Sequence, residues 1–336
     1  MKYVYIYGGA IGDSLLGIHM GRVLSQSLPN QKIVLISTRK NAFVRELVSS
    51  LPFVEYHEVI KTNPFSWGEL LCLTVSKNAI ALIEPSDVPI PLWWRIILFA
   101  GTLVAGSREV HGEVVGHSRT RNKKIDAVVI TPSESLFTVF VPDVIRAWGV
   151  TPLSVAPSLA RETITDKQQP YILFHFFAGN YRRSFPIEKA RPLLMQARNK
   201  FPSYEFVVSA SPAEHERVLA MAKGISNTRI ASDLSASQMI LLLQQASLTV
   251  GVASGITHIA AHLDVPTIVL ANLSDPYWLP TYNEKIVLLS DKEHCACNGN
   301  KSGLCVEHTP GGDVFRCLYY VPNESILDEM EKVLLA

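Results

Sequence analysis

Apolar runs of strand length alternate with amphipathic stretches of helix length through the first half of the chain. The runs that predict strands are residues 3–7, 32–37, 79–84 and 127–131. The stretches that predict helices are residues 13–27, 41–50, 67–75 and 141–148. The strand-like runs are apolar at nearly every position, which is typical of strands buried on both faces of a parallel sheet. Strands that alternate with helices in this way predict a parallel α/β unit.

The same rhythm starts again in the second half, after a polar interruption. Residues 154–170 are polar and carry prolines towards both ends, which is typical of a linker. Further strands are predicted at residues 171–176, 204–210, 228–232, 248–254 and 267–272. Further helices are predicted at residues 186–200, 212–223, 235–245 and 255–263, with one more at the C-terminus. We therefore expect an N-terminal lobe at residues 1–157, a linker at 158–170 and a C-terminal lobe at 171–336.

Two α/β units joined by a linker predict an α/β fold of two Rossmann-like lobes that face each other across a cleft. The length of 336 residues is enough for two domains of ordinary size. A composition of 48% apolar and 18% charged residues fits large sheets that are covered on both faces. In such sheets ligands bind at the carboxyl ends of the strands, in the loops that lead into the next helix. The candidate chemistry should therefore lie in those loops.

Charge and cysteine content narrow the function classes. The formal net charge of +1 gives no general electrostatic attraction to nucleic acid, so no nucleic-acid partner is expected. The chain has five cysteines, and its first residues resemble a strand and not a secretory signal. This combination predicts a cytoplasmic protein, because disulfides are rare in that compartment.

One apolar segment leaves three interpretations open. Residues 89–106 are apolar apart from Arg95 and are almost long enough to cross a bilayer. The arginine, two prolines and two glycines favour a buried helix of the first lobe over a span. A third interpretation is peripheral contact with the inner membrane, with Trp93 and Trp94 inserted at the interface.

The loop at residues 251–266 has the features of an anion site. Ser254, Gly255 and Thr257 stand at the predicted start of a helix, where unpaired N–H groups and the helix dipole favour negative charge, and His258 follows. Ser or Thr at this position can also be a simple helix cap. The neighbouring loop at 175–186 contains Arg182 and Arg183, which suit phosphate geometry but can also be a solvated surface pair.

Four cysteines cluster near the C-terminus. They are Cys295, Cys297, Cys305 and Cys317. In a cytoplasmic chain such a cluster predicts a structural zinc or iron site, with free thiols as the alternative. The Cys-x-Cys spacing is tighter than the common Cys-x₂-Cys, so the pattern does not decide between them.

The sequence resembles glycosyltransferase family nine, the ADP-heptose:lipopolysaccharide heptosyltransferases. The resemblance rests on "IGDSLLGIHMGRVLSQSLP" (11–29), "RRSFP" (182–186), residues 234–280 and "CLYYVPNESI" (317–326). It implies the GT-B fold, with the acceptor on the N-terminal lobe and the nucleotide sugar on the C-terminal lobe. The function it implies is an inverting, metal-independent glycosyltransferase that moves a sugar, with ADP-heptose favoured as donor, to a lipopolysaccharide-core or related surface glycan.

The resemblance also implies roles for single residues. Asp13 matches the general base that deprotonates the acceptor hydroxyl, and Arg183 matches a basic position that neutralises the donor diphosphate. Ser254, Gly255 and His258 match the donor-phosphate loop, in which Thr257 is also expected to contribute. Glu214 matches an acidic residue that holds the nucleoside, although a solvated glutamate on a helix face explains it equally well. No cofactor is needed for this chemistry.

Two departures from the family pattern leave other functions open. Ala253 stands where an aspartate usually holds donor-sugar hydroxyls, and the basic position is Arg183 instead of lysine. The loss of that aspartate admits a different donor sugar or a catalytically impaired binding protein. The cysteine cluster admits a protein-directed, autotransporter-type heptosyltransferase, because some of those enzymes carry a comparable iron-binding motif. The opening turn lacks Gly-x-Gly-x-x-Gly, which argues against a dinucleotide enzyme.

Overall fold

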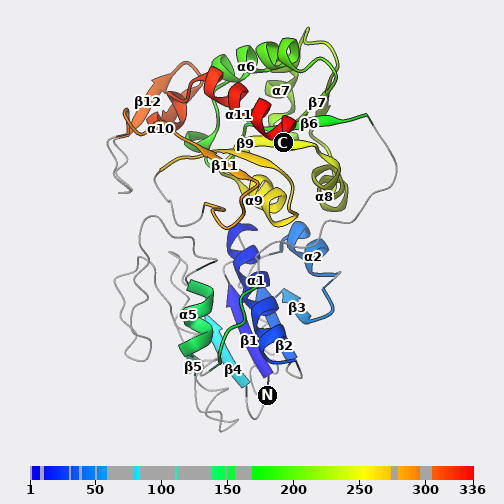
Figure 1. The fold of residues 1–336 in the computed structure, drawn as a ribbon, viewed down its shortest axis with the longest axis vertical. Helices are drawn as coiled ribbons and strands as arrows, with labels where there is room; N and C mark the ends of the chain where they lie inside the picture. Colours follow the sequence, from blue (N-terminus) through cyan, green and yellow to red (C-terminus); the bar gives the residue numbers. More distant parts are fainter. Residues whose placement is uncertain are drawn as a thin grey trace. The chain divides into compact units, whose positions relative to one another are not determined.

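The computed structural model describes most of the C-terminal half and separate segments of the N-terminal half. The described residues are 2–7, 11–29, 32–37, 40–49, 51–58, 79–83, 110–111, 138, 140–147, 150–155, 169–273, 279–295 and 305–336. The chain divides into two compact units, Met1–Pro157 and Ser158–Ala336. Each unit is built on a parallel sheet (Figure 1).

The N-terminal unit has a five-stranded sheet in the order β3-β2-β1-β4-β5, in which every neighbouring pair is parallel. The strands are β1 (Lys2–Tyr7), β2 (Lys32–Ser37), β3 (Val54–Glu58), β4 (Ala79–Ile83) and β5 (Val110–His111). The helices among the described residues of this unit are α1 (Ile11–Ser27), α2 (Ala42–Ser49) and α5 (Phe140–Ala147). Helix α1 packs closely on the sheet because Gly21 has no side chain. A Cβ there would lie 3.3 Å from Val54 Cγ2.

The C-terminal unit has a six-stranded parallel sheet in the order β11-β10-β9-β6-β7-β8. The strands are β6 (Tyr171–His175), β7 (Glu205–Ser209), β8 (Thr228–Ala231), β9 (Leu248–Val252), β10 (Thr267–Leu270) and β11 (Ile286–Leu289). The chain runs outward from β6 to β8 and then returns to place β9 on the other side of β6. This reversal is the topological switch of a Rossmann sheet, beside which ligands bind.

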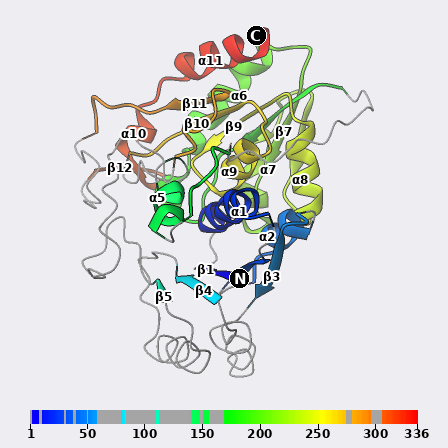
Figure 2. The ribbon, with the colours of Figure 1, turned by 60° about the horizontal axis from the view of Figure 1, so that its bottom comes forward.

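Helices cover both faces of this second sheet (Figures 1 and 2). They are α6 (Ile187–Lys200), α7 (His215–Ala222), α8 (Ala236–Gln245), α9 (Gly255–His262), α10 (Arg316–Tyr319) and α11 (Asn323–Leu335). Buried side chains of α6, α7, α10 and α11 form one core cluster with β6, β7, β9 and β10. The helices α8 and α9 lie on the opposite face (Figure 1). Two 3-10 turns, η1 (Tyr181–Arg183) and η2 (Pro212–Glu214), and an antiparallel hairpin of β12 (Val306–Thr309) and β13 (Gly312–Phe315) complete the unit.

The predicted elements agree with the structure to within one to three residues at each end wherever the chain is described. At residues 212–223 η2 precedes α7 in place of a single helix, and the elements β3, β5, β11, β12, β13 and α10 were not predicted from the sequence. The predicted strand at 127–131 and helix at 67–75 lie outside the described residues, as does the apolar segment 89–106. None of the helices in the described part of the chain has the length and apolar character needed to span a bilayer.

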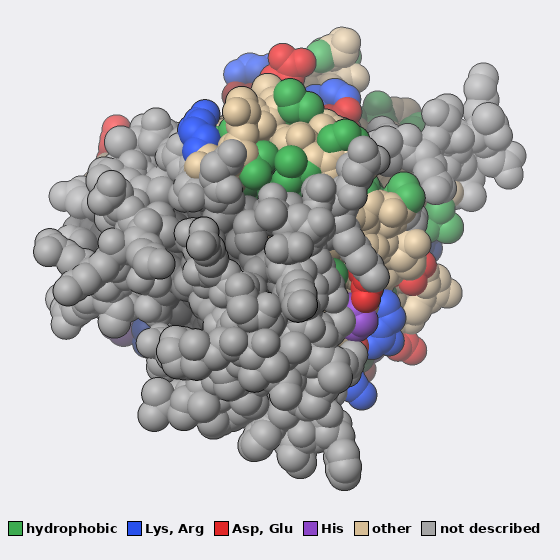
Figure 3. Space-filling view, turned by 90° about the horizontal axis from the view of Figure 1, so that it is seen from below, with side chains coloured by type: hydrophobic (Ala, Val, Ile, Leu, Met, Phe, Trp, Pro, Cys, Tyr) green, Lys and Arg blue, Asp and Glu red, His purple; other side chains and the backbone are tan. Residues whose placement is uncertain are grey.

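The surface formed by the described residues carries charges of both signs. On the face drawn in Figure 3, Lys or Arg and Asp or Glu side chains both occur among the described residues. This mixture agrees with the formal net charge of +1 over the whole chain.

Candidate functional site

A close approach of two strands shapes the carboxyl edge of the C-terminal sheet. His175, the last residue of β6, is paired in register with Gly251 of β9. A Cβ at Gly251 would lie 2.5 Å from the carbonyl oxygen of His175 and 3.0 Å from Thr257 Cγ2. Glycine is therefore required where β9 is added beside β6, and its lack of a side chain allows the start of α9 to lie directly against the ends of both strands.

The first turn of α9 is held by a threonine. The N–H of Ser254 donates to Thr257 Oγ1 at 3.1 Å. The Thr257 hydroxyl lies 2.8 Å from the carbonyl oxygen of Val252 and 3.0 Å from that of Ser254, and donates there. These bonds fix the turn, but Ser254 Oγ is buried and has no hydrogen-bond partner. The N–H groups of Gly255 and Ile256 have no acceptor within the helix, because the first turn of any α-helix leaves them free.

The loop after β6 is closed on itself. The N–H of Phe185 donates to the carbonyl oxygen of Phe176 at 2.8 Å, and the two rings stack with centroids 5.7 Å apart. The N–H of Ala178 donates to Ser184 Oγ at 3.0 Å. Both phenylalanines are buried. The loop is therefore a rigid support for the short turn η1 that lies within it.

The two arginines of η1 have different surroundings. Arg182 Nη2 lies 3.4 Å from Asp313 Oδ2 on β13, so its charge is paired. The N–H of Arg183 donates to the carbonyl oxygen of Asn180 at 2.9 Å, whereas its side-chain Nε is buried with no hydrogen-bond partner. Of the two arginines predicted from the sequence, Arg183 is the one whose side chain keeps an unused hydrogen-bond donor.

Two buried histidines lie beside these groups. Burial, together with the positive charge of Arg183, lowers the pKa of His258 to about 4. Burial also lowers the pKa of His175 to about 4, against the opposing effect of the Glu214 carboxylate. His175 Nδ1 lies 3.0 Å from Ser209 Oγ, whereas His258 Nδ1 is buried without a partner. Both imidazoles are neutral at physiological pH.

Glu214 stands at the end of the loop that follows β7. Its Oε2 accepts from the N–H of Ser211 at 3.1 Å and from Ser211 Oγ at 2.8 Å, which closes the turn η2. The side chain is half-buried. Both interpretations made from the sequence therefore remain open, because a carboxylate that caps a turn still has a second oxygen for a ligand.

Asp13 lies in the other unit. It is in the first turn of α1, shortly after β1, at the carboxyl edge of the N-terminal sheet and beside the switch between β1 and β4. The backbone position is the one expected for a residue that meets a ligand of a Rossmann-like lobe. Its side chain lies outside the described part of the structure.

Three of the four cysteines are described. Cys295 Sγ and Cys305 Sγ are 4.0 Å apart, and neither forms a disulfide. The chain around Cys317 is close by, because the N–H of Arg316 donates to the carbonyl oxygen of Cys305 at 3.2 Å. Cys297 lies outside the described residues. Among the described residues, no three His, Cys, Asp or Glu side chains come together as metal ligands do.

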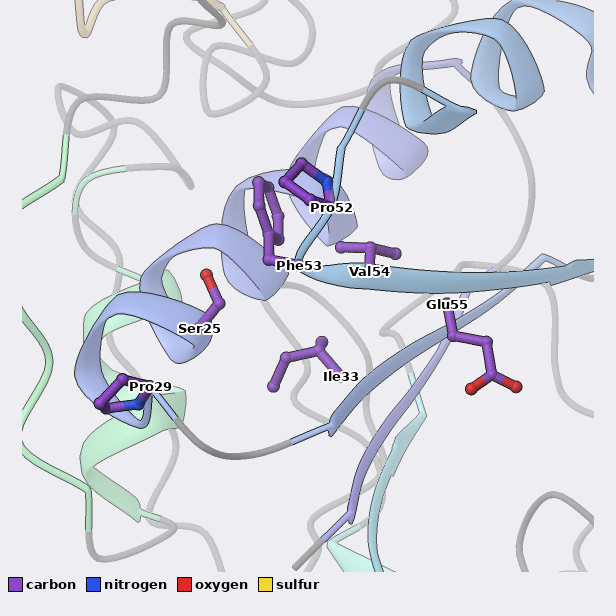
Figure 4. Close-up of a pocket in the computed structure, with 7 residues that line it drawn as sticks. All are labelled: Ser25, Pro29, Ile33, Pro52, Phe53, Val54 and Glu55. Carbon is purple, nitrogen blue, oxygen red and sulfur yellow. The ribbon is translucent and has the colours of Figure 1, made fainter.

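A pocket in the N-terminal unit contains none of these residues. Figure 4 shows the lining of this pocket, with Ser25 near the end of α1, Pro29 just after that helix, Ile33 on β2, and Val54 and Glu55 at the start of β3. Pro52 and Phe53 complete the lining. These are the amino ends of β2 and β3, so the pocket is at the opposite edge from Asp13. It contains no residue predicted from the sequence.

The structure brings most of the residues that the sequence predicts for donor binding to one edge of one sheet. Arg183, Ser254, Gly255, Thr257 and His258 share the carboxyl edge at the sheet switch, and His175 with Glu214 adjoins them. One fixed cation, a hydroxyl, a neutral imidazole and free helix N–H groups suit the oxygens of a diphosphate. His175 was not among the residues predicted from the sequence, although a histidine at the carboxyl end of a buried strand is itself a signal of a ligand site.

Comparisons with known proteins agree with this arrangement. Residues 142–305 match the model of glycosyltransferase family 9 (heptosyltransferase). Lipopolysaccharide heptosyltransferase 1 of Pseudomonas aeruginosa is 36% identical over 279 residues, which are 82% of this chain and 71% of that protein. The E. coli ADP-heptose LPS heptosyltransferase II structure has a TM-score of 0.68 at 18% identity and covers 100% of this chain and 99% of its own.

A second similar structure is the dodecameric iron-containing heptosyltransferase TibC in complex with ADP-D-beta-D-heptose, from enterotoxigenic E. coli. It has a TM-score of 0.60 at 12% identity and covers 99% of this chain and 76% of its own. The fold and the matches define a glycosyltransferase built from two Rossmann-like lobes of the GT-B type. The chain belongs to glycosyltransferase family 9, the heptosyltransferase family. The fold class, the family and the enzyme class predicted from the sequence are confirmed.

Proposed function

We propose that the protein transfers a heptosyl group from ADP-heptose to a lipopolysaccharide-core or related surface-glycan acceptor, with inversion and without a catalytic metal. The observation that carries the proposal is a set of three buried polar atoms without partners: Arg183 Nε, Ser254 Oγ and His258 Nδ1. Buried polar atoms are nearly always paired, so a group of unpaired ones at one sheet edge indicates that a ligand completes them. The names of similar enzymes favour ADP-heptose as that ligand.

The donor half of the mechanism follows from the charges of these residues. When the bond between the anomeric carbon and the diphosphate breaks, negative charge develops on the departing ADP. Arg183 and the N–H groups at the start of α9 lie in fixed positions to stabilise that charge, which lowers the barrier without reorganisation. The neutral ring of His258 donates a hydrogen bond from one nitrogen. Together these groups provide the charge stabilisation that a divalent cation provides in other transferases.

The acceptor half requires a base. In the proposed step the Asp13 carboxylate takes the proton of the acceptor hydroxyl while the oxygen of that hydroxyl bonds to the anomeric carbon. The carbon–oxygen bond to the β-phosphate breaks, and its electron pair leaves with ADP. A single displacement with one base inverts the anomeric centre, whereas retention by double displacement needs a second, nucleophilic carboxylate. Ala253 cannot accept a hydrogen bond from the sugar, so recognition of the heptose falls to other residues.

The test is an activity panel with matched variants. Purified protein is incubated with nucleotide sugars, ADP-heptose first, with and without lipopolysaccharide-core acceptors, and ADP release is measured. We expect Asp13→Ala to lower kcat by about 10²- to 10⁴-fold, as loss of a general base does. Arg183→Gln should lower kcat/KM by about 10²-fold through loss of leaving-group stabilisation. Arg229→Gln, which removes an equal charge from an exposed pair with Glu205, is the control.

Three results would contradict the proposal. Full transfer activity of Asp13→Ala would remove the assigned base. Preference for another nucleotide sugar would correct the donor. Binding of ADP-heptose without transfer to any acceptor would favour a catalytically impaired binding protein, the alternative that Ala253 motivates.

A second function is a protein-directed, autotransporter-type heptosyltransferase, and the separation of 4.0 Å between Cys295 Sγ and Cys305 Sγ favours it. Two thiolates on one tetrahedral metal are separated by about this distance, given zinc–sulfur bonds of about 2.3 Å. Cys295, Cys297, Cys305 and Cys317 would then hold a structural zinc or iron that fixes the tail. Metal found by elemental analysis, with a high-order oligomer in solution, would support this function, and a metal-free monomer would contradict it.

We propose the same location and partners for the protein as the sequence predicts. The enzyme works in the cytoplasm, with peripheral contact to the inner membrane where a lipid-linked acceptor lies. Sedimentation with anionic vesicles tests the contact. A protein that stays in the supernatant with and without acceptor lipid would contradict it.

A further inference from the structure

The hairpin β12–β13 packs against the turn that carries Arg183. Strand β13 is in contact with η1, although more than a hundred residues separate the two in sequence. Gly312 has φ = +114°, and a Cβ there would lie 3.4 Å from Tyr181 Cε2 and 3.5 Å from Cδ2. One edge of the Tyr181 ring therefore lies against the hairpin at Gly312, where the positive φ favours glycine.

An ion pair joins the same two elements. Arg182 Nη2 lies 3.4 Å from Asp313 Oδ2, and the other oxygen of Asp313 lies 2.7 Å from His308 Nδ1. His308 and Asp313 are opposite each other in the register of the hairpin. The carboxylate is thus held by the hairpin on one side and holds η1 on the other.

The hairpin has its own anchor in the core of the C-terminal unit. Val314 is buried in the core cluster, and Phe315 packs against it. The turn is closed by Thr309, whose hydroxyl donates to the carbonyl oxygen of Gly312 at 2.8 Å and accepts from the N–H of Gly311 at 3.2 Å. A fixed element therefore contacts two of the three residues of η1.

The geometry of a 3-10 turn links those contacts to Arg183. With three residues per turn, successive side chains point about 120° apart. When Tyr181 and Arg182 are held against the hairpin, the direction of Arg183 is fixed as well, and it faces the side where it lowers the pKa of His258. We infer that the β12–β13 hairpin positions Arg183 for the donor diphosphate, with Asp313 as the main positioning residue. This inference rests on the proposed function of Arg183.

The test separates positioning from stability. Asp313→Asn keeps the shape of the side chain and removes the charge that holds Arg182. Glu307→Gln is the matched control, because it removes an equal charge from the same hairpin and breaks a pair of similar length, 3.3 Å to Arg316 Nε. Each full-length variant is titrated with ADP alone, assayed for KM of the donor and kcat, and unfolded in urea. Partly exposed pairs contribute at most about 1 kcal/mol, so both variants should unfold nearly as the parent does.

We expect Asp313→Asn to raise the Kd for ADP about tenfold and Glu307→Gln to leave it unchanged. In a protein that already carries Arg183→Gln, the Asp313→Asn change should not raise the Kd for ADP any further, because both changes act through the Arg183 side chain. Arg182→Gln should reproduce the effect of Asp313→Asn, and the Arg182→Gln/Asp313→Asn double variant should be no weaker than either.

Three outcomes would overturn the inference. If Asp313→Asn binds ADP more tightly, the carboxylate only neutralises Arg182 and does not orient the turn. If Arg183→Gln weakens ADP binding but Asp313→Asn does not, the hairpin is not a positioning element, although the function proposed for Arg183 stands. If Arg183→Gln itself leaves ADP affinity unchanged, the proposed role of Arg183 fails and the inference fails with it.

Discussion

Two fully buried threonines of the C-terminal sheet differ in one hydrogen bond. Thr249 Oγ1 on β9 has no partner, whereas Thr267 Oγ1 on β10 donates to the carbonyl oxygen of Val265 at 2.8 Å. An unpaired buried hydroxyl is a cost to stability, and valine has nearly the same shape. Thr249→Val should therefore raise the free energy of unfolding by about 1 kcal/mol, and Thr267→Val should lower it by about the same amount. Urea unfolding followed by circular dichroism measures both, and equal effects would contradict the assignment.

The close approach at the sheet switch gives a second prediction for a single residue. Gly251→Ala would force a methyl group to within 2.5 Å of the His175 carbonyl oxygen, which belongs to the backbone and cannot move aside cheaply. We expect a loss of roughly 3 kcal/mol in unfolding free energy, at the upper end of ordinary overpacking costs. Gly179→Ala is the control, since no atom lies within 4 Å of the added Cβ. Equal stability of the two variants would contradict the prediction.

Single residues also show the limit of prediction from sequence. The pattern "YRRSFP" places two arginines before a helix and cannot say which one is available. Arg182 is paired with Asp313, a residue 131 positions away, and this contact exists only after the hairpin has folded onto η1. Arg183 was chosen through the family resemblance, not through its surroundings. The need for glycine at 251 likewise arises from a partner strand that begins 80 residues earlier, so no local pattern reveals it.

At the scale of elements, two histidines at the sheet edge predict how stability depends on pH. His175 ends β6 and His258 lies in α9, and burial lowers the pKa of each from 6.5 to about 4. The unfolded chain therefore binds more protons than the folded chain between these values, so stability falls as the pH falls. Between about pH 7.5 and about pH 5 we expect a loss of about 2 kcal/mol for each histidine. Urea midpoints across this range measure it.

Variants assign this loss to the two side chains. His175→Gln and His258→Gln should each remove about half of the pH dependence, and the double variant should remove most of it. A single variant with the parent's full pH dependence would show that its imidazole is not buried as the structure has it. Saturating ADP should reduce the dependence on His258 in particular, because a phosphate beside the ring favours the charged imidazole.

The elements that the sequence predicted well are those with continuous apolar patterns. Every residue of β6 and β9 is buried, and both strands were predicted from their apolar runs. Strands β3, β11 and β12, which it missed, are of intermediate burial at nearly every position, and β11, "IVLL", was missed although all four of its residues are apolar. Strand β3, "VEYHE", is of intermediate burial throughout because it is the last described strand at its edge of the sheet. The hairpin strand β12, "VEHT", contains one apolar residue. Edge strands and surface hairpins carry polar side chains, so the apolar pattern that identifies a strand is weak in them.

For the whole molecule, the rhythm of strands and helices predicts two α/β units but not the order of strands within each sheet. The sheets have the orders β3-β2-β1-β4-β5 and β11-β10-β9-β6-β7-β8. In both, the first three strands are added towards one edge, and the fourth is then placed on the other side of the first, which reverses the order of addition. That reversal decides which loops become neighbours. The loop with Arg183 and the loop with Ser254 are about 70 residues apart in sequence and meet because β6 and β9 are adjacent. The sequence supplied the residues, and the topology assembles them.

The residues proposed to bind the donor all belong to one unit, which leads to a prediction about the chain as a whole. Residues 158–336 contain a complete six-stranded sheet with helices on both faces and a core cluster of their own. We expect this fragment to unfold cooperatively and to bind ADP with a Kd within about threefold of the full chain, a difference of less than 1 kcal/mol. Transfer should be lost, because Asp13 lies in residues 1–157. Calorimetric titration with ADP and a urea unfolding curve measure both properties. A folded fragment that does not bind ADP would mean that residues of the N-terminal unit contribute directly to the donor site, and the assignment of nucleotide binding to Arg183, Ser254 and His258 would then be incomplete.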